Sequence, residues 1–448
     1  MLLIGNGRVV TRDDDNPYIE DGAVAVDGEV IVEVGELSQL KAKYPEAEFV
    51  DAKGGVIMPG LINCHTHIYS GLARGLAIKD CNPHNFLENL EQQWWNIDRH
   101  LDLDGTRASA YATVLDSIRD GVTTIFDHHA SFREIPGSLF AIKDVCKEVG
   151  IRSCLCYEVS DRDGEEKCDQ AIKENADFAQ WAHDENDNMI AAMFGGHALF
   201  TLSDETLDKM VKANNGLTGY HIHVSEGMDD VYDSLQNYGC RPVERLLNHD
   251  GILGEKTMLG HCIHVNAAEM EIIEKTGTNL VNNPESNMGN AVGCAPVLEF
   301  MKRGIPVCMG TDAYTHDVLE SLKVFLIIQR HNACMPNVAW CEDFDMLFKN
   351  NRMMAEKYFP KYDLGILRKG AAADITIFDY KPFTPFSEEN VDGHILFGMM
   401  GKNCRTTIIN GQVVYKDREF VNIDEDAINA WTMEQAKRLW GELNDRVY

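Results

Sequence analysis

The chain has 448 residues, 44% of them apolar, and its 71 acidic residues outnumber 41 Lys and Arg to give a net charge of −30. That charge disfavours nucleic acids and anionic membrane surfaces as partners, because few cations are available to neutralise phosphates. The length suits two or three average domains or one large α/β barrel with an appendage. We therefore expect a protein with a solvated acidic exterior.

Two β-rich segments lie at the ends of the chain. Residues 1–55 contain short strands, with Asp27-Gly28 as a hairpin signal, and Asn410-Gly411 marks a second hairpin near the C-terminus. The middle of the chain, between these two segments, has a different sequence pattern. These ends predict one composite β-sandwich domain made of residues 1–56 and 365–424.

Apolar strand patterns alternate with amphipathic, charged stretches through the middle of the chain. After a first strand, further strands are predicted at 123–129, 152–159, 190–198, 219–226, 257–263, 278–284 and 306–313. Charged helical stretches separate them, for example at 136–149, 166–186, 229–248 and 295–303. Eight mostly apolar strands with intervening helices predict a parallel (β/α)8 TIM-like barrel over residues 57–364.

Two further helical segments accompany the barrel. Residues 85–100 contain Trp94 and Trp95 and predict a helical insert after the first barrel strand, which we interpret as a lid. The tail at 425–448 carries apolar residues at helical spacing and predicts a C-terminal helix docked on the body or on a partner subunit.

The cysteines and the N-terminal segment indicate a compartment. Thirteen cysteines are scattered without a CxxC pair, which fits free thiols in a reducing environment. The N-terminus shows no apolar signal segment, and no run reaches the ~18 apolar residues of a membrane span. We expect a cytoplasmic protein.

The segment VIMPGLINCHTHIYS (56–70) carries the strongest chemical signal. His65 and His67 are one residue apart, so on a strand both imidazoles face the same way and can bind one metal ion. The alternative is that they are chance neighbours in a half-buried strand. That alternative weakens because further ionisable groups stand at later strand ends, which converge on one face of a barrel. These groups are His223, Glu226, His261 and Asp312.

Three imidazoles and one carboxylate suit Zn²⁺ or Fe²⁺ and leave one position open for water. No strand end offers a lysine to bridge a second metal. The sequence therefore predicts one divalent metal ion, with Zn²⁺ preferred and Fe²⁺ as the alternative.

Motifs in family order along nearly the whole chain resemble the amidohydrolase superfamily, in its mononuclear aminohydrolase (deaminase) branch. They are PGLINCHTH, LARG (72–75), GGHALFTLS (195–203), HVSE, GHCIH, NPESN (283–287), GTD and GILRKGAAADITIFD. Within that branch, DHHAS (127–131) and GTDAYTHD (310–317) resemble the aminohydrolase group called SsnA.

The resemblance implies His65, His67, His223 and Asp312 as metal ligands. His221 is a rival to His223, since it shares the same strand face one repeat deeper. On the sixth strand the family pattern points to His261, and we interpret His264 as structural.

Catalytic roles follow from the resemblance and the chemistry of such sites. A divalent cation lowers the pKa of bound water, so that hydroxide is available near neutral pH. Asp312 is expected to accept the proton of that water, and Glu226 to protonate a ring nitrogen of the substrate. His261 is expected to hold the nucleophile and the developing oxyanion.

Three residues are predicted to bind substrate. His197 matches a family histidine that contacts heterocycles, although a buried core histidine is the alternative. His128 or His129 could face the barrel, and we favour His128. Asp98 falls where nucleoside deaminases place a ribose-contacting acid, but Asn89 replaces their nearby aromatic residue. This departure, together with the 314–317 loop, favours a free base over a nucleoside.

These observations predict a hydrolase of non-peptide C–N bonds that attacks an amino-substituted, purine-, pterin- or triazine-like N-heterocycle with metal-bound hydroxide and releases ammonia. The first alternative is hydrolytic ring opening of a cyclic amide or amidine. The second is a catalytically silent barrel that serves in assembly, which the complete ligand set disfavours. We expect a small-molecule substrate and a homodimer.

Overall fold

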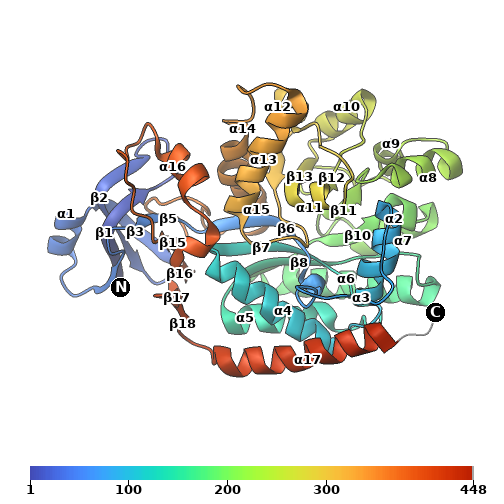
Figure 1. The fold of residues 1–448 in the computed structure, drawn as a ribbon, viewed down its shortest axis with the longest axis horizontal. Helices are drawn as coiled ribbons and strands as arrows, with labels where there is room; N and C mark the ends of the chain where they lie inside the picture. Colours follow the sequence, from blue (N-terminus) through green and yellow to red (C-terminus); the bar gives the residue numbers. More distant parts are fainter. Residues whose placement is uncertain (446–448) are drawn as a thin grey trace.

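The computed structural model describes residues 1–445 and consists of a barrel beside a β-rich domain (Figure 1). The barrel has eight strand positions, and all neighbouring strands pair in parallel. The strands are β6 (Leu61–Thr66), β7 (Val122–His129), β8 (Arg152–Tyr157), β9 (Ile190–Ala192) with β10 (Phe194–Ala198), β11 (Tyr220–Val224), β12 (Met258–His261), β13 (Asn279–Asn282) and β14 (Val307–Met309).

Two isolated bridges close this ring. β9 and β10 form the two halves of the fourth position, interrupted at Met193, and β10 also contacts the third position through the Val159–Gly196 bridge. The Thr66–Asp312 bridge joins the first position to the residues that follow the eighth. The predicted (β/α)8 barrel is thereby confirmed.

Every barrel strand is buried along its whole length. Helices cover the outer faces while side chains fill the interior, which is why the strands are mostly apolar in sequence. The helices of this region are α4 (Leu103–Arg119), α5 (Ser138–Val149), α6 (Glu165–Glu185), α7 (Asp204–Asn214), α8 (Met228–Tyr238), α9 (Pro242–Leu247), α10 (Ala267–Thr276), α11 (Pro284–Gly289), α12 (Val297–Lys302), α13 (Val318–Ala333), α14 (Glu342–Phe344) and α15 (Asn351–Tyr358).

Sulfur-containing side chains fill the barrel interior beneath the histidines. Cys64, Cys154, Cys156 and Cys308 belong to one buried cluster with Met258. All thirteen cysteines fall within residues 1–445 and are free thiols. The four cysteines of the cluster pack the core, since a buried thiol behaves as a small apolar group.

Strands from both ends of the chain build one nine-stranded sheet, in the order β18-β17-β16-β15-β5-β1-β2-β3 with β4 on β1. Val30, the first residue of β3, also bridges Ala372 just before β15, so the sheet folds over on itself around an apolar core. Its strands are β1 (Leu2–Val10), β2 (Tyr18–Asp27), β3 (Val30–Glu36), β4 (Glu48–Asp51), β5 (Val56–Pro59), β15 (Ile375–Phe378), β16 (Cys404–Ile409), β17 (Gln412–Lys416) and β18 (Glu419–Phe420), with α1 (Leu37–Lys43) and α16 (Val391–Gly398) beside them.

The insert after β6 is helical, as its sequence predicts. It comprises a 3₁₀ turn at Ile68–Ser70, α2 (Phe86–Asn89), a π-helical turn at Leu90–Trp94 and α3 (Trp95–Asp98). Asn85 caps α2 by accepting a hydrogen bond from the Glu88 amide.

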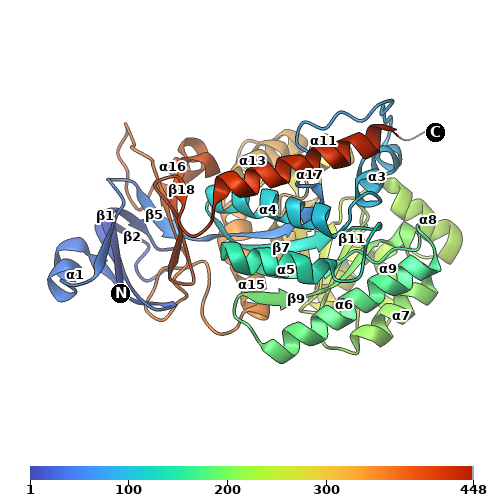
Figure 2. The ribbon, with the colours of Figure 1, turned by 90° about the horizontal axis from the view of Figure 1, so that it is seen from below.

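The C-terminal helix α17 (Glu425–Asp445) lies along α4 and reaches the insert (Figures 1 and 2). The Trp440 indole donates to the Leu72 carbonyl at 2.8 Å, and Arg438 pairs with Asp102 at 2.7 Å. A helix was predicted over 425–448, of which 446–448 lie outside the described residues. In residues 1–445 no helix combines the length and the apolar character that crossing a membrane requires.

Candidate metal centre and active site

The strand ends bring the predicted ionisable groups together at one face of the barrel. His65 lies on β6 with His67 just beyond it, His223 on β11 and His261 at the end of β12. Asp312 follows β14 and bridges back to Thr66. All five of these groups are at most 6% exposed, in keeping with an enclosed centre.

The hydrogen bonds of two imidazoles leave their Nε2 atoms free to bind a metal. His67 Nδ1 donates to the His128 carbonyl at 2.6 Å, and His223 Nδ1 donates to the His197 carbonyl at 2.9 Å. A carbonyl only accepts, so both rings carry a proton on Nδ1, and Nε2 is the nitrogen that a metal would bind once it is deprotonated. Backbone carbonyls thus fix the tautomers of both side chains.

His65 lies between two other histidines. Its Nε2 is 3.3 Å from His223 Nε2, and its Nδ1 is 2.9 Å from His221 Nε2. A metal bound at Nε2 of His65 requires the proton on Nδ1, and His221 Nε2 is the acceptor placed to receive that hydrogen bond. The structure therefore places His221, the rival ligand, one layer behind the centre.

Asp312 is the carboxylate of the centre. Its Oδ1 is 3.2 Å from His67 Nε2, and its Oδ2 accepts a hydrogen bond from Ser286 Oγ at 2.7 Å. Burial raises the pKa of Asp312, but the hydrogen bond and charge of His67 outweigh it and hold that pKa well below its usual range. Asp312 is therefore an anion.

This donor set fits one divalent ion. The ligand atoms of His65, His67 and Asp312 lie within 4.8 Å of one another, as do those of His65, His223 and His261. Burial lowers the pKa of His65 and His223 well below the usual value, so both rings are neutral, as metal ligation requires. These features support a divalent metal ion at the site.

A neighbouring compact group does not offer a second site. It consists of His67, His128, Glu158 and His223. His128 Nδ1 is 3.0 Å from Glu158 Oε1, and its Nε2 is 3.0 Å from the His221 carbonyl. Both ring nitrogens of His128 are thus engaged by oxygen atoms and do not face open space.

Glu226 and His261 stand beside Asp312. His261 Nδ1 donates to Asn287 Oδ1 at 2.7 Å, while its buried Nε2 has no hydrogen-bond partner within residues 1–445. That nitrogen is 3.4 Å from Glu226 Oε2 and 3.5 Å from Asp312 Oδ2. Burial raises the pKa of Glu226 to about 7, although the charge of His261 opposes the shift. A carboxyl with such a pKa can give or take a proton near neutral pH.

Unusual backbone conformations accompany two of these side chains. His261 has φ 66° and Asp312 has φ 57°, both in the left-handed region that non-glycine residues rarely adopt. The Asp312 amide donates to the His65 carbonyl at 2.9 Å and holds that turn in place. Such conformations cluster at functional sites, where surrounding structure compensates for their cost.

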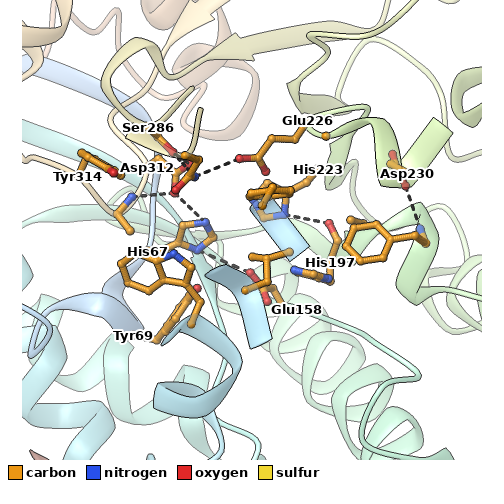
Figure 3. Close-up of a pocket in the computed structure, with 18 residues that line it drawn as sticks. His67, Tyr69, Glu158, His197, His223, Glu226, Asp230, Ser286, Asp312 and Tyr314 are labelled. Atoms are coloured by element: carbon orange, nitrogen blue, oxygen red, sulfur yellow. Dashed lines mark hydrogen bonds and ion pairs between the residues drawn. The ribbon is translucent and has the colours of Figure 1, made fainter. Parts of the chain in front are cut away.

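A small pocket of about 40 Å³ opens beside the centre (Figure 3). The insert supplies its apolar wall through Phe86, Leu90 and Trp94. Its polar lining consists of His67, Glu158, His197, His223, Glu226, Asp230, Ser286, Asn290, Asp312 and Tyr314. The insert thus closes one side of the space beside the centre.

A larger cavity of about 440 Å³ lies outside this pocket and shares Trp94, Asn290, Ala313 and Tyr314 with it. Asn89 lines the outer cavity and donates to Asn290 Oδ1 at 3.0 Å. The Asn290 amide in turn donates to Glu226 Oε1 at 3.3 Å. A hydrogen-bonded chain therefore connects the insert to Glu226.

Of the three predicted substrate-binding residues, one lies on the pocket wall. His197 lines the pocket, and its Nδ1 is 2.8 Å from Thr201 Oγ1. The structure does not bring Asp98 or His128 to the wall. Asp98 is buried in an ion pair with Arg162, and His128 lies beneath the ligands with both nitrogens engaged.

Sequence reasoning overlooked several residues of the site. Glu158 follows β8, and Ser286 and Asn290 lie in and after α11, while Tyr314 belongs to the loop after β14. Glu158 could have been found, because it ends the third predicted strand as His197 ends the fourth. Ser286 belongs to the NPESN motif (283–287), but the motif alone does not show that its side chain reaches Asp312, and Asn290 lies outside it.

Comparison with known proteins agrees with this geometry. Residues 56–414 match the model of the Amidohydrolase family. The protein belongs to the amidohydrolase family. Residues 22–47 also match the imidazolonepropionase-like composite domain of bacteria. The predicted family and the predicted hydrolase class are confirmed.

Named relatives extend over the whole chain. A 5'-deoxyadenosine deaminase of Methanosarcina mazei is 29% identical, covering 100% of this chain and 99% of the relative. A 5-methylthioadenosine/S-adenosylhomocysteine deaminase of Pelotomaculum thermopropionicum is also 29% identical, covering 98% of each chain.

Solved structures confirm the fold. A zinc-bound adenosine deaminase from Xanthomonas campestris superposes with a TM-score of 0.85 at 22% identity and covers 98% of both chains. A zinc complex of atrazine chlorohydrolase from Arthrobacter aurescens gives 0.80 at 23% identity, covering 97% of this chain and 100% of that one.

Proposed function

We propose that the protein is an aminohydrolase that holds one Zn²⁺ and removes an amino group, as ammonia, from an N-heterocycle. The observation that carries the proposal is the convergence of His65, His67, His223 and Asp312 beside Glu226. These donors suit Zn²⁺, and zinc is present in structures of similar fold.

The bound ion would lower the pKa of a water molecule and so supply a nucleophile near neutral pH. Asp312 Oδ2 accepts a proton from the attacking water. Glu226 donates a proton to a ring nitrogen, which makes the neighbouring amino-bearing carbon electrophilic. His261 Nε2, between these two carboxylates, hydrogen-bonds the incoming oxygen. The C–N bond then breaks, and the ring gains oxygen while ammonia leaves.

The pocket favours a planar ring as substrate. Tyr69, Phe86 and Trp94 provide flat apolar walls, and His197 offers a polar edge. We propose that the insert acts as a lid, since its residues Phe86, Leu90 and Trp94 line the pocket beside the centre. The two relatives named above are deaminases of adenine nucleosides by their names. We keep the free base as the preferred substrate because Asp98 is paired with Arg162.

We also propose a homodimer in the cytoplasm. In this proposal residues 1–56 and 365–424 form the composite β domain, residues 57–364 the catalytic barrel and residues 425–448 the C-terminal segment. The nine-stranded sheet supports the first boundary, since its strands come from both ends of the chain.

The test is a screen of ammonia release across free bases, nucleosides, pterins and aminotriazines, with elemental analysis of the purified protein. We expect about one Zn per chain and ammonia release that leaves the absorbance of the ring system in place. Two tightly held metals per chain would contradict the mononuclear centre. Loss of the ring absorbance would instead indicate hydrolytic ring opening.

A further inference from the structure

Glu158 is a pocket carboxylate to which the proposed mechanism gives no task. It follows β8 and is 2% exposed, yet it lines the pocket. Figure 3 shows it below His223, with Glu226 above that histidine. Proton transfer is assigned to Glu226 and Asp312, so a third carboxylate needs another explanation.

The two carboxylate oxygens of Glu158 differ: Oε1 lies near two histidines, and Oε2 accepts no hydrogen bond from the described residues. Oε1 is 3.0 Å from His128 Nδ1 and 3.7 Å from His67 Nδ1. Within residues 1–445 no hydrogen bond reaches Oε2.

Asp230 provides an internal comparison. It lines the same pocket and is equally buried, but both of its oxygens are occupied. Oδ1 accepts from the Phe200 amide at 2.9 Å, and Oδ2 accepts from the Ser225 amide at 2.7 Å. Asp230 therefore ties together loops of the site, whereas Glu158 lines the pocket with one acceptor that no described residue occupies.

A buried carboxylate oxygen without a donor is costly, so a ligand that supplies one is favoured. We propose that Glu158 Oε2 accepts a hydrogen bond from a ring N–H of the substrate, on the edge away from the amino group that leaves. This inference rests on the proposed function for its heterocyclic substrate. It names the substrate class as bases that keep a free ring N–H.

The same contact excludes N-substituted rings. In adenine the N9–H is a donor, and the remaining ring nitrogens are acceptors. Methylation or glycosylation at N9 removes that donor and leaves only lone pairs on the ring nitrogens to face an anion. Glu158 thus acts as a specificity-determining residue that favours the free base.

The experiment measures the binding of adenine and 9-methyladenine to zinc-loaded protein by calorimetry; guanine is left out because 9-methylguanine keeps a ring N–H at N1. The Glu226→Gln background prevents turnover during titration. In this background we expect adenine to bind more tightly than 9-methyladenine. Adding Glu158→Gln should weaken adenine binding ~10- to 100-fold, the scale of a hydrogen bond to a charged group, and change 9-methyladenine binding less than ~2-fold.

Asp230→Asn is the matched control, since it makes the same change from carboxylate to amide in the same pocket. It should leave the ratio of free to methylated affinities unchanged. Equal loss for both probes in Glu158→Gln, or loss of zinc, would show that Glu158 only supports His67 and would overturn the proposal. Tighter binding of 9-methyladenine, or no binding of adenine, would do the same.

Adenosine and 2',3'-dideoxyadenosine distinguish a sugar hydroxyl from a ring N–H as the donor. If Glu158→Gln weakens adenosine alone, the acceptor serves a ribose and the N–H assignment is wrong. Ammonia release by the unmodified enzyme is scored separately. Its absence with every base would refute the proposed function, while an intact probe ratio would still support the role of Glu158.

Discussion

Replacing His221 with Phe tests whether the layer behind the ligands controls metal binding. His221 is fully buried, and its Nε2 lies 2.9 Å from Nδ1 of His65. Phenylalanine fills a similar volume but accepts no hydrogen bond from an N–H in the ring plane. In the variant, His65 either keeps its proton on Nδ1 without a partner or moves it to Nε2, where it blocks the metal.

The size of the effect follows from that choice. Leaving a buried donor unpaired costs about 1–3 kcal/mol. Each ~1.4 kcal/mol is a tenfold change in an equilibrium constant, so zinc affinity should fall ~10- to 100-fold. Removal of outer-layer partners of metal-binding histidines has effects of the same ~10–100-fold scale.

The assay is the zinc dissociation constant measured by competition with a chromophoric chelator. His221→Gln, which offers an amide oxygen in a similar place, should recover part of the affinity. His264→Phe is the control, because His264 bonds the Val292 carbonyl and touches none of the ligands. Unchanged zinc affinity in His221→Phe, or equal losses in both Phe variants, would refute the reasoning.

Three further substitutions separate the roles of pocket residues. Glu226→Gln should keep the metal but lower kcat by at least ~100-fold, the usual scale of acid–base catalysis, and unchanged turnover would remove Glu226 from the mechanism. His197→Ala should raise KM through loss of a partner worth ~1–3 kcal/mol without changing zinc content. Asp98→Ala should lower the unfolding free energy by up to about 3–5 kcal/mol, because it removes the buried partner of Arg162 and leaves only Asp163, at 3.6 Å, to pair with it; a denaturant titration with an unchanged midpoint would contradict this.

The sequence predicts that the ionisable side chains of the site come together, because strand ends converge by topology. His65, His67, His223, His261 and Asp312 each stand at the end of a predicted strand, so the eight-strand pattern alone brings them to one face. We can therefore predict that these residues lie close together without knowing how the loops fold. The barrel and the C-terminal helix can be predicted as well, because the spacing of apolar residues that indicates them is a local property of the sequence.

Residues in the layers around that centre are harder to predict. Asp98 and His128 both belong to suggestive motifs, but their partners are Arg162 and Glu158, which are remote in sequence. A pairing between such residues depends on how loops pack, and pattern alone does not specify it. Glu158 also stands at the end of a predicted strand. The rule that strand ends meet at one face of the barrel would therefore have identified it, although it belongs to none of the motifs.

The contact between α17 and the insert has a consequence for biosynthesis. Trp440 bonds the carbonyl of Leu72, a residue 368 positions earlier in the chain. At a translation rate of ~5–20 residues per second, Leu72 emerges roughly 20–70 s before its partner exists. The segment after β6 thus gains this contact only when α17 has been made, well after the eight barrel strands.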